Sequence, residues 1–349
     1  MTVIDVRPAL RLDTRRLETW LGDVLPEYRG PLDIRQFQGG QSNPTYLLQT
    51  PDARYVLRRK PPGVLLQSAH AVDREFRVMR ALGQAGFPVP EMLALCIDDS
   101  VIGTMFYVMR FVEGRIFPLC TMPGLTREAR AAAYDSANET LARLHSLDPT
   151  ALGLSDFGRA GDYFGRQIAR WSKQYEASQT SDIPEMERLI AWLPAAVPAD
   201  DSTGLVHGDY SFHNLLFHPT EPRVAAVLDW ELSTIGHPLA DLMYHAMEWY
   251  RPPGVDRRGT LRGEHLVTFG IPDLETYLAS YCARTGRKPI ENPAFYRAFS
   301  LFRTAAIVQG IVGRARNGTA ADADTARHAA RVRPLAIAAW REAQDAGAV

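Results

Sequence analysis

Cysteine is scarce in this sequence, and long apolar runs are absent. The 349 residues include three cysteines, at positions 96, 120 and 282, with no C-x-x-C pair and no metal-ligand spacing. This excludes a disulfide framework or a zinc site as the basis of the fold. The uncharged run from Thr304 to Gly313 is too short to span a bilayer, and the amino terminus has no secretory apolar core. We therefore expect a cytoplasmic protein without a membrane segment.

An excess of charge of one sign is also absent. The chain has 39 Lys plus Arg against 40 Asp plus Glu, a net charge of −1, so nothing electrostatic favours a nucleic-acid partner. Hydrophobic content of 46% and charged content of 23% are ordinary for a globular protein, and the length allows one large domain or two lobes. No internal repeat or low-complexity segment occurs. None of these features indicates the oligomeric state.

Two polar stretches in the middle of the chain each follow a short apolar run that is typical of a buried strand. The first is residues 207–214 (HGDYSFHN), called here the Asp209 loop, and the second begins at Asp229. Asp209 and Asn214 have the spacing of Asp and Asn in the kinase motif H-R-D-x-x-x-x-N. Phosphoryl transfer needs one carboxylate for the hydroxyl proton, and an amide oxygen and a second carboxylate for Mg²⁺. A simple polar turn is the alternative, but Asp229 at the end of a following strand argues against it.

Near the amino terminus, three short β-type segments surround a glycine-containing loop. The segments lie around residues 34–37, 46–48 and 55–57. Glycine allows backbone N–H groups to approach phosphates closely, although Gly-Gly is also an ordinary hairpin connection. The loop residues that we expect to contact a nucleotide are Gly39, Gly40, Gln41, Ser42 and Asn43.

The third of these segments continues into cations. Strand alternation puts Val56, Arg58 and Lys60 on one face. A cation two residues beyond a small apolar residue is the V-A-I-K arrangement, in which the charge reaches the α- and β-phosphates. We expect Arg58 to be this phosphate ligand, with Lys60 as the second choice and a solvated strand end as the alternative.

A helix is predicted over residues 71–85, with one apolar stripe. The stripe consists of Val72, Phe76, Met79 and Leu82. Glu75 lies beside the stripe and could pair with the strand cation, as kinases require. A surface glutamate bonded to Arg74 or Arg77 is the alternative.

Residues 106–112 form a β-rich run that could become the hinge between two lobes, with backbone groups near Arg110 and Val112 bonding an adenine edge. A plain core strand is the alternative. We expect residues 1–112 to form an N-terminal helix and a small nucleotide-binding lobe. Residues 113–349 should form a helical lobe that carries the Asp209 loop and the acceptor site.

The predicted fold class is α+β, with helices dominating after residue 113. Asp13 can cap a first helix that carries Leu17, Trp20, Leu21 and Val24 on one face. Thr126 can cap another. The later helices are expected over residues 126–147, 163–175, 184–196, 238–250, 274–284, 293–312 and 320–346, the last broken or bent at Pro334.

The Asp209 loop, Asp229 and residues 236–241 (GHPLAD) resemble the aminoglycoside phosphotransferase and choline kinase superfamily, which has the two-lobed protein-kinase-like fold. Residues 55–63, 69–75 and 229–232 are most similar to the branch that occurs as the kinase domain of acyl-CoA dehydrogenase fusion proteins. The motifs cover roughly residues 37–241.

The resemblance implies ATP as the phosphoryl donor, Asp209 as catalytic base, and Asn214 and Asp229 as Mg²⁺ ligands. It also implies that His207 and Asp241 hold the Asp209 loop in shape. The sequence departs from kinases in its glycine loop and in having arginine for lysine. A further departure is that Trp230-Glu231 replaces the Phe-Gly of D-F-G. No A-P-E segment follows, which disfavours protein substrates.

The leading hypothesis is therefore a small-molecule kinase with a hydroxyl acceptor, and the alternatives are a nucleotide-binding pseudokinase and an aminoglycoside- or choline-type kinase. No motif for a flavin domain supports a dehydrogenase. Residues 241–349 contain 15 basic against 11 acidic residues, a balance of +4, which disfavours a polycationic acceptor. Arg303 and Arg314 could meet a carboxylate or phosphate. A hydroxyacyl-CoA or hydroxy acid is the acceptor that we favour.

Overall fold

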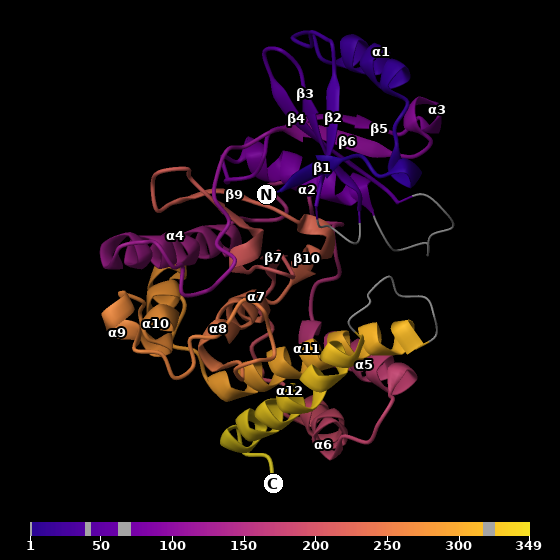
Figure 1. Ribbon diagram of the computed structural model, residues 1–349. Helices are drawn as coiled ribbons and strands as arrows, with labels where there is room; N and C mark the ends of the chain where they lie inside the picture. Colours follow the sequence, from indigo (N-terminus) through magenta and orange to yellow (C-terminus); the bar gives the residue numbers. More distant parts are fainter. Residues whose placement is uncertain (1, 39–42, 62–70, 317–324) are drawn as a thin grey trace. The chain divides into compact units, whose positions relative to one another are not determined.

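The structure is a computed structural model that describes residues 2–38, 43–61, 71–316 and 325–349 (Figure 1). Contacts divide the chain into two compact units. The first unit contains Met1–Ile116, Leu152–Leu154 and Asn214–Ser233, and the second contains Phe117–Ala151, Ser155–His213 and Thr234–Val349. The first unit thus includes a segment from the middle of the chain, beyond the predicted range 1–112.

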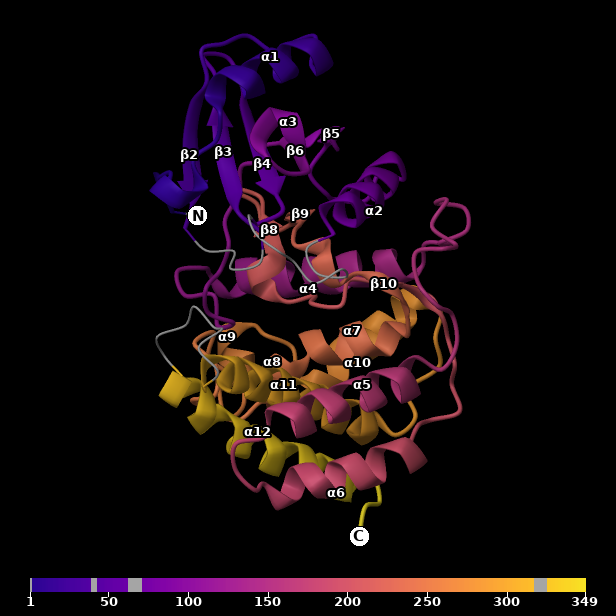
Figure 2. The same ribbon diagram turned by 90° about the vertical axis from the view of Figure 1, so that its right-hand side faces the viewer.

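The first unit is built on a six-stranded sheet in which all neighbours are antiparallel, in the order β1-β2-β3-β4-β6-β5. The strands are β1 (Val3–Asp5), β2 (Asp33–Phe37), β3 (Thr45–Gln49), β4 (Arg54–Arg59), β5 (Met92–Cys96) and β6 (Phe106–Arg110). The helices are α1 (Thr14–Val24), α2 (Val72–Gln84) and α3 (Asp99–Ile102). Figure 2 shows the strands of this sheet from the side.

Strand alternation gives the sheet two apolar faces. Tyr55 and Leu57 of β4 belong to a core cluster that also contains Leu17 and Leu21 of α1, while Val56 belongs to a separate cluster. Asp13 caps α1 by accepting a hydrogen bond from the N–H of Arg16, as predicted. On the predicted α1 face Leu17 and Leu21 are buried, whereas Val24 in the last turn is exposed.

The stripe predicted for α2 is confirmed, because Val72, Phe76, Met79 and Leu82 are all buried. A hairpin from the middle of the chain completes the first unit, formed by β8 (Leu215–Phe217) and β9 (Val224–Val227). The backbones of Phe217 and Arg115 bond to each other, and the N–H of Val227 donates to the carbonyl of Pro88. These bonds explain why this segment belongs to the first unit.

The second unit is mainly helical and includes a two-stranded antiparallel pair, β7 (Gly204–Val206) and β10 (Thr234–Gly236). Its helices are α4 (Arg127–His145), α5 (Tyr163–Ser178), α6 (Pro184–Trp192), α7 (Pro238–His245), α8 (Met247–Tyr250), α9 (Leu266–Phe269), α10 (Leu274–Thr285), α11 (Pro293–Arg316) and α12 (Thr325–Asp345). α11 and α12 pack along each other, as Figures 1 and 2 show. None of the helices in the described ranges combines the length and apolarity that crossing a bilayer requires.

Two of these helices differ from the prediction. The helix expected over residues 238–250 divides at Ala246, where ψ is −4°. The break expected at Pro334 does not occur, since α12 continues through this residue, and the alternative of a bend stays a prediction. Proline removes one backbone hydrogen bond. The buried face of α12, which includes Leu335 and Ala339, stabilises the helix through tertiary packing.

Candidate active site

In the first unit, Arg58 of β4 lies among three carboxylates. Its Nε is 3.1 Å from Oε2 of Glu75, and its Nη2 is 2.9 Å from Oδ1 of Asp229 and 3.1 Å from Oε2 of Glu231. The Glu75 side chain is 1% exposed, so this glutamate is directed into the unit. The predicted pair between the strand cation and the helix glutamate is therefore present. The planar guanidinium of arginine carries several N–H donors, so one side chain can contact several carboxylates.

Two further side chains hold Glu75. Asn43 donates from Nδ2 to Oε1 at 3.0 Å, and the Tyr107 hydroxyl donates to Oε2 at 3.1 Å. Burial raises the pKa of Glu75 to about 7, although the charge of Arg58 opposes that shift. Burial would lower the pKa of Arg58, but Glu75, Tyr107 and Asp229 raise it above its ordinary value. Arg58 thus remains a fixed cation.

The register of the sheet explains why Arg58 and not its neighbours reaches these acids. Arg58 pairs with Thr45 of β3 and Tyr107 of β6, so it shares a face with Tyr107. Arg59 points to the opposite face, where its guanidinium lies 5.8 Å from the centre of the Tyr46 ring. Lys60, the second choice, lies beyond the strand, 3.9 Å from Asp73. Arg58 is accordingly the cation of this acidic cluster.

The hairpin brings Asn214 and Asp229 together. Leu228 donates its N–H to the Asn214 carbonyl at 2.8 Å, and Asp229 follows directly in a left-handed conformation with φ +66°. The next residue, Trp230, is buried and donates from Nε1 to the carbonyl of Val227 at 3.0 Å. This anchor fixes the turn, so the Asp229 carboxylate leaves the strand at a defined point.

These two residues have the donor types of a magnesium site. Among the described residues, no group of three or more His, Cys, Asp or Glu side chains could hold a metal. Mg²⁺ needs fewer protein ligands, because it is usually bound by one or two carboxylates together with substrate phosphates and water. The Asp229 side chain is 36% exposed and available to such a ligand set. Asn214 and Asp229 therefore fit the ion.

In the second unit, Asp241 of α7 holds the start of the Asp209 loop. Its carboxylate accepts from the backbone N–H groups of His207 and Gly208, the latter at 2.8 Å. Nε2 of His145 lies 3.4 Å away. Burial would raise the pKa of Asp241, but the bond with His145 and the charge and backbone groups of the loop lower it. His207 in turn accepts from the N–H of Asp209 at Nδ1. These contacts agree with the predicted role of His207 and Asp241, which is to hold the Asp209 loop in shape.

Asp209 has a polar neighbourhood on the second unit. Oδ2 is 3.9 Å from Nε2 of His213, and its side chain is 23% exposed. Burial, together with the charge and a hydrogen bond of Asp209, raises the pKa of Tyr244. Arg303 donates from Nη2 to the carbonyl of Gly208 at 2.6 Å. The base candidate is thus held from several sides and still open to solvent.

His245, at the end of α7, packs against the Asp209 loop. It is buried, its Nε2 is 2.7 Å from the Tyr277 hydroxyl, and its ring lies 4.8 Å from that of Phe212 and 5.2 Å from that of Tyr210. Burial lowers its pKa from 6.5 to about 3. The folded protein therefore holds a neutral histidine that the unfolded chain would protonate in mild acid.

This shift predicts a pH effect on stability. Between about pH 6.5 and 3 the unfolded chain binds the proton and the folded chain does not, so stability falls with falling pH. Over two pH units the loss is roughly 2–3 kcal/mol per group. In denaturant titrations at pH 6.5 and 4.5, His245→Gln should lose less stability than wild type by about that amount. The exposed variant His265→Gln should behave as wild type, and equal losses in all three proteins would contradict the prediction.

Three side chains of the site were not predicted from the sequence. Glu231 was noted only as a departure from D-F-G, yet it shares Arg58 with Asp229. Tyr244 follows Asp241 by three residues on α7, a spacing that could have suggested a shared helix face. Arg258 gave no signal, because its contact with His213 joins residues 45 positions apart, with Nη1 3.0 Å from Nδ1.

One predicted nucleotide contact has one donor fewer than expected. The N–H of Arg110 donates to the carbonyl of Glu91 at 2.9 Å, and its side chain bonds to Glu91 and Glu27. Because the sheet already uses this N–H, the contact would need another backbone group near Arg110, and it stays a prediction. Val112 lies beyond β6 and stays a prediction. Residues 39–42 of the glycine loop lie outside the described residues.

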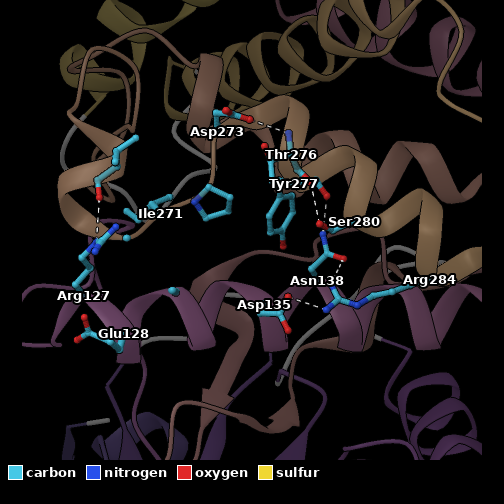
Figure 3. Close-up of a pocket in the computed structure, with 14 residues that line it drawn as sticks. Arg127, Glu128, Asp135, Asn138, Ile271, Asp273, Thr276, Tyr277, Ser280 and Arg284 are labelled. Carbon is cyan, nitrogen blue, oxygen red and sulfur yellow. Dashed lines mark hydrogen bonds and ion pairs between the residues drawn. The ribbon is translucent and has the colours of Figure 1, made fainter.

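A cavity of about 580 Å³ lies between α4 and the α9–α10 segment of the second unit. Figure 3 shows Asp135 and Asn138 of α4 facing Arg284 of α10, which donates to both at 2.7 Å. None of the predicted site residues that the structure describes lines this cavity. It is therefore separate in its residues from the candidate active site.

The first unit thus contains an arginine–glutamate pair beside an exposed carboxylate, and the second unit contains a loop-held aspartate; phosphoryl-transfer enzymes use groups of these kinds. The family model described as "Phosphotransferase enzyme family" matches residues 33–297. The chain therefore belongs to the phosphotransferase enzyme family, and it is an enzyme that transfers a phosphoryl group to a hydroxyl acceptor. The resemblance drawn from the motifs is confirmed.

Similar proteins agree with this assignment. A candidate aminoglycoside phosphotransferase of Ralstonia eutropha is 47% identical, with a TM-score of 0.88 over 96% of this chain and 99% of that one. Acyl-CoA dehydrogenase family member 10 of Mus musculus is 45% identical over 98% of this chain. Family member 11 of Rattus norvegicus is 45% identical over 95%. The predicted two-lobed, kinase-like α+β fold is confirmed.

This chain is much shorter than those two curated relatives. It spans 32% of the mouse protein and 43% of the rat protein. The similarity therefore concerns one part of each relative.

Proposed function

We propose that this phosphotransferase is an ATP- and Mg²⁺-dependent small-molecule kinase that moves the γ-phosphoryl group to a hydroxyl. The contact of Arg58 with both Glu75 and Asp229 carries the proposal. It fixes a cation for phosphate beside a carboxylate that suits Mg²⁺, and phosphoryl transfer depends on such positioning and charge stabilisation.

Each residue has a separate role in this proposal. Asp209 accepts the proton of the acceptor hydroxyl, and Arg58, oriented by Glu75, binds the phosphates. Asn214 and Asp229 hold Mg²⁺, which neutralises phosphate charge when bound. The buried Asn43, which donates to Glu75, ties the end of the glycine loop to the same cluster.

Two further parts of the proposal concern nucleotide binding. The backbone groups near Arg110 and Val112 are the candidates for the adenine edge. Residues 1–112 supply the nucleotide-binding lobe, and residues 113–349 supply the Asp209 loop and the acceptor site. The hairpin that carries Asn214 and Asp229 belongs with the first unit, which supports a metal site built next to Arg58.

For the acceptor, we favour a hydroxyacyl-CoA or a hydroxy acid. The basic balance of residues 241–349 supports an anionic molecule, and the names of the mouse and rat relatives point to acyl-CoA chemistry. An aminoglycoside is the second candidate, supported by the description of the Ralstonia protein. The presence of Asp209, Asn214 and Asp229 argues against a pseudokinase. A screen for ATP consumption with hydroxyacyl-CoA, hydroxy-acid, aminoglycoside and choline acceptors tests these alternatives.

Binding of Mg²⁺ and ATP should stabilise the protein through Asp229. Ligand at about a hundred times its dissociation constant adds roughly 2.7 kcal/mol to the free energy of unfolding. We expect this gain in wild type and its loss in Asp229→Ala, measured by denaturant titration with and without Mg²⁺ and ATP. Asp52→Ala, an exposed change in the first unit, should retain the gain. An unchanged gain in Asp229→Ala would remove Asp229 from the metal site.

A further inference from the structure

Three guanidinium groups of the second unit converge on one carboxylate. Asp256 Oδ2 lies 2.6 Å from Nη2 of Arg258, 3.4 Å from Nη1 of Arg251 and 3.7 Å from Nη2 of Arg331. Arg251 is buried and also pairs with Glu248, so its charge is compensated. Arg258 and Arg331 then share a single acid. The cluster carries an excess of positive charge.

Arg331 is poorly compensated within this cluster. Its Nη1 lies 3.2 Å from Nδ1 of His328, while its Nε is buried and has no hydrogen-bond partner among the described residues. Burial lowers the pKa of Arg331, and the charges of Arg258 and Arg251 add to this effect against that of Asp256. The side chain is still 21% exposed. A solvent-accessible anion would therefore find an unsatisfied cation here.

A second uncompensated cation, Arg303, lies nearer the base candidate. It is 7% exposed, and no residue in the described ranges forms a hydrogen bond with its buried Nε. Within the described part of the chain it forms no ion pair; its guanidinium instead lies 5.1 Å from the Tyr244 ring and 5.8 Å from the Trp171 ring. A buried charge that has no ion-pair partner costs stability unless the site supplies an opposite charge.

The cluster reaches Asp209 through one residue. Nη1 of Arg258 is 3.0 Å from Nδ1 of His213, and Nε2 of His213 is 3.9 Å from Oδ2 of Asp209. Tyr244 forms a hydrogen bond with Asp209, and the charges of Arg258 and Arg303 both act to lower the pKa of Tyr244. Positive charge thus lies beside the base on the second unit itself.

We propose that Arg258 and Arg331 form a subsite for the acid group of the acceptor, a carboxylate or a phosphate, with Arg303 adding attraction from the buried side. The subsite rests on the proposed kinase function. It anchors the acceptor by its acid while the hydroxyl meets Asp209. The subsite selects hydroxylated acids over neutral or cationic alcohols.

Binding of small probes tests the subsite without turnover. Calorimetric titrations of the full chain, with Mg²⁺ and ADP present, would use glycerol 3-phosphate, glycerate and glycerol. We expect both acids to bind and glycerol to bind at least about tenfold more weakly, because a charge-assisted contact is lost. The stronger of the two acids identifies the preferred acid group. Equal binding of the acids and glycerol, or no binding of either acid, would overturn the proposal.

Matched variants locate the effect. Arg331→Gln should weaken acid binding about tenfold or more, and Arg331→Lys, which keeps the charge but not the fork, should weaken it less. Arg333→Gln, an exposed change on the same helix, should bind acids as wild type does. Thermal melts of each variant confirm folding. Equal acid affinity in Arg331→Gln and Arg333→Gln would assign the cluster a purely structural role.

Turnover separates this proposal from the proposed function. If wild type phosphorylates glycerol and glycerate with equal kcat/KM, the subsite is wrong and the kinase function stands. If the acids bind through Arg331 but no hydroxylated acceptor in the broader screen causes ATP consumption, the kinase function is wrong and the anion site stands. A preference for glycerate or glycerol 3-phosphate that Arg331→Gln removes would support both.

Discussion

Asp209→Asn is expected to lower kcat by about 10²–10⁴-fold, the usual value of general-base catalysis, and to leave nucleotide binding unchanged. The carboxylate lies on the second unit near His213 and Tyr244, whereas Arg58, Asn214 and Asp229 belong to the first unit. An amide has nearly the same shape but cannot take the proton of the acceptor hydroxyl.

The measurement is ADP formation with an acceptor found in the screen, beside a calorimetric titration with Mg²⁺ and ATP. Asp148→Asn, an exposed change in the second unit, serves as the matched control. A full rate in Asp209→Asn would remove Asp209 as the base. A loss of ATP affinity equal to the loss of rate would instead show that Asp209 acts in nucleotide binding.

The Arg58–Glu75 pair could be predicted because both residues sit in elements with a clear period. Alternation along β4 gives the face of Arg58, and the apolar stripe of α2 places Glu75 beside the buried side. Kinases pair a strand cation with a helix glutamate, and this knowledge predicts that Arg58 and Glu75 form a pair. Glu231 escaped prediction because its side-chain direction depends on the left-handed turn at Asp229, which no local period encodes.

The arginine cluster around Asp256 could not be predicted for a different reason. Arg258 and Arg331 lie in a loop and on the last helix, and only tertiary packing brings both to Asp256. The sequence showed the regional charge balance of +4 but not which arginines converge. The structure shows that Arg303 contacts a backbone carbonyl and two aromatic rings, and its expected contact with a carboxylate or phosphate of the acceptor stays a prediction.

The use of the Arg110 donor and the continuity of α12 at Pro334 both depend on tertiary context. The run 106–112 had the composition of a strand, but composition cannot tell which backbone donors a neighbouring chain will use, and Glu91 uses that of Arg110. Proline predicts a break from local sterics alone. Packing of α12 against α11 offsets that local cost.

Asp241→Asn is expected to lower the free energy of unfolding by about 1.5–3 kcal/mol at pH 7, the usual effect of losing a hydrogen bond to a buried charged group. The carboxylate accepts from the N–H groups of His207 and Gly208 and lies near His145. Burial lowers the pKa of His145, so that ring is neutral. An amide would turn a donor toward one of these groups and leave it unsatisfied. Because the same bonds hold the Asp209 loop, kcat should fall as well.

The lowered pKa of Asp241 also predicts how the stability difference between wild type and Asp241→Asn changes with pH. The pKa of Asp241 is lower in the folded protein, so its contribution is complete above the unfolded value of about 3.9 and is lost as the pH falls through the folded value. Denaturant titrations should therefore show a constant gap between wild type and Asp241→Asn from about pH 8 to 5, and a shrinking gap below about pH 4. Asp135→Asn, which loses an exposed pair with Arg284, should cost at most about 1 kcal/mol. A gap for Asp241→Asn that does not shrink in acid would mean that shape, and not charge, holds the loop.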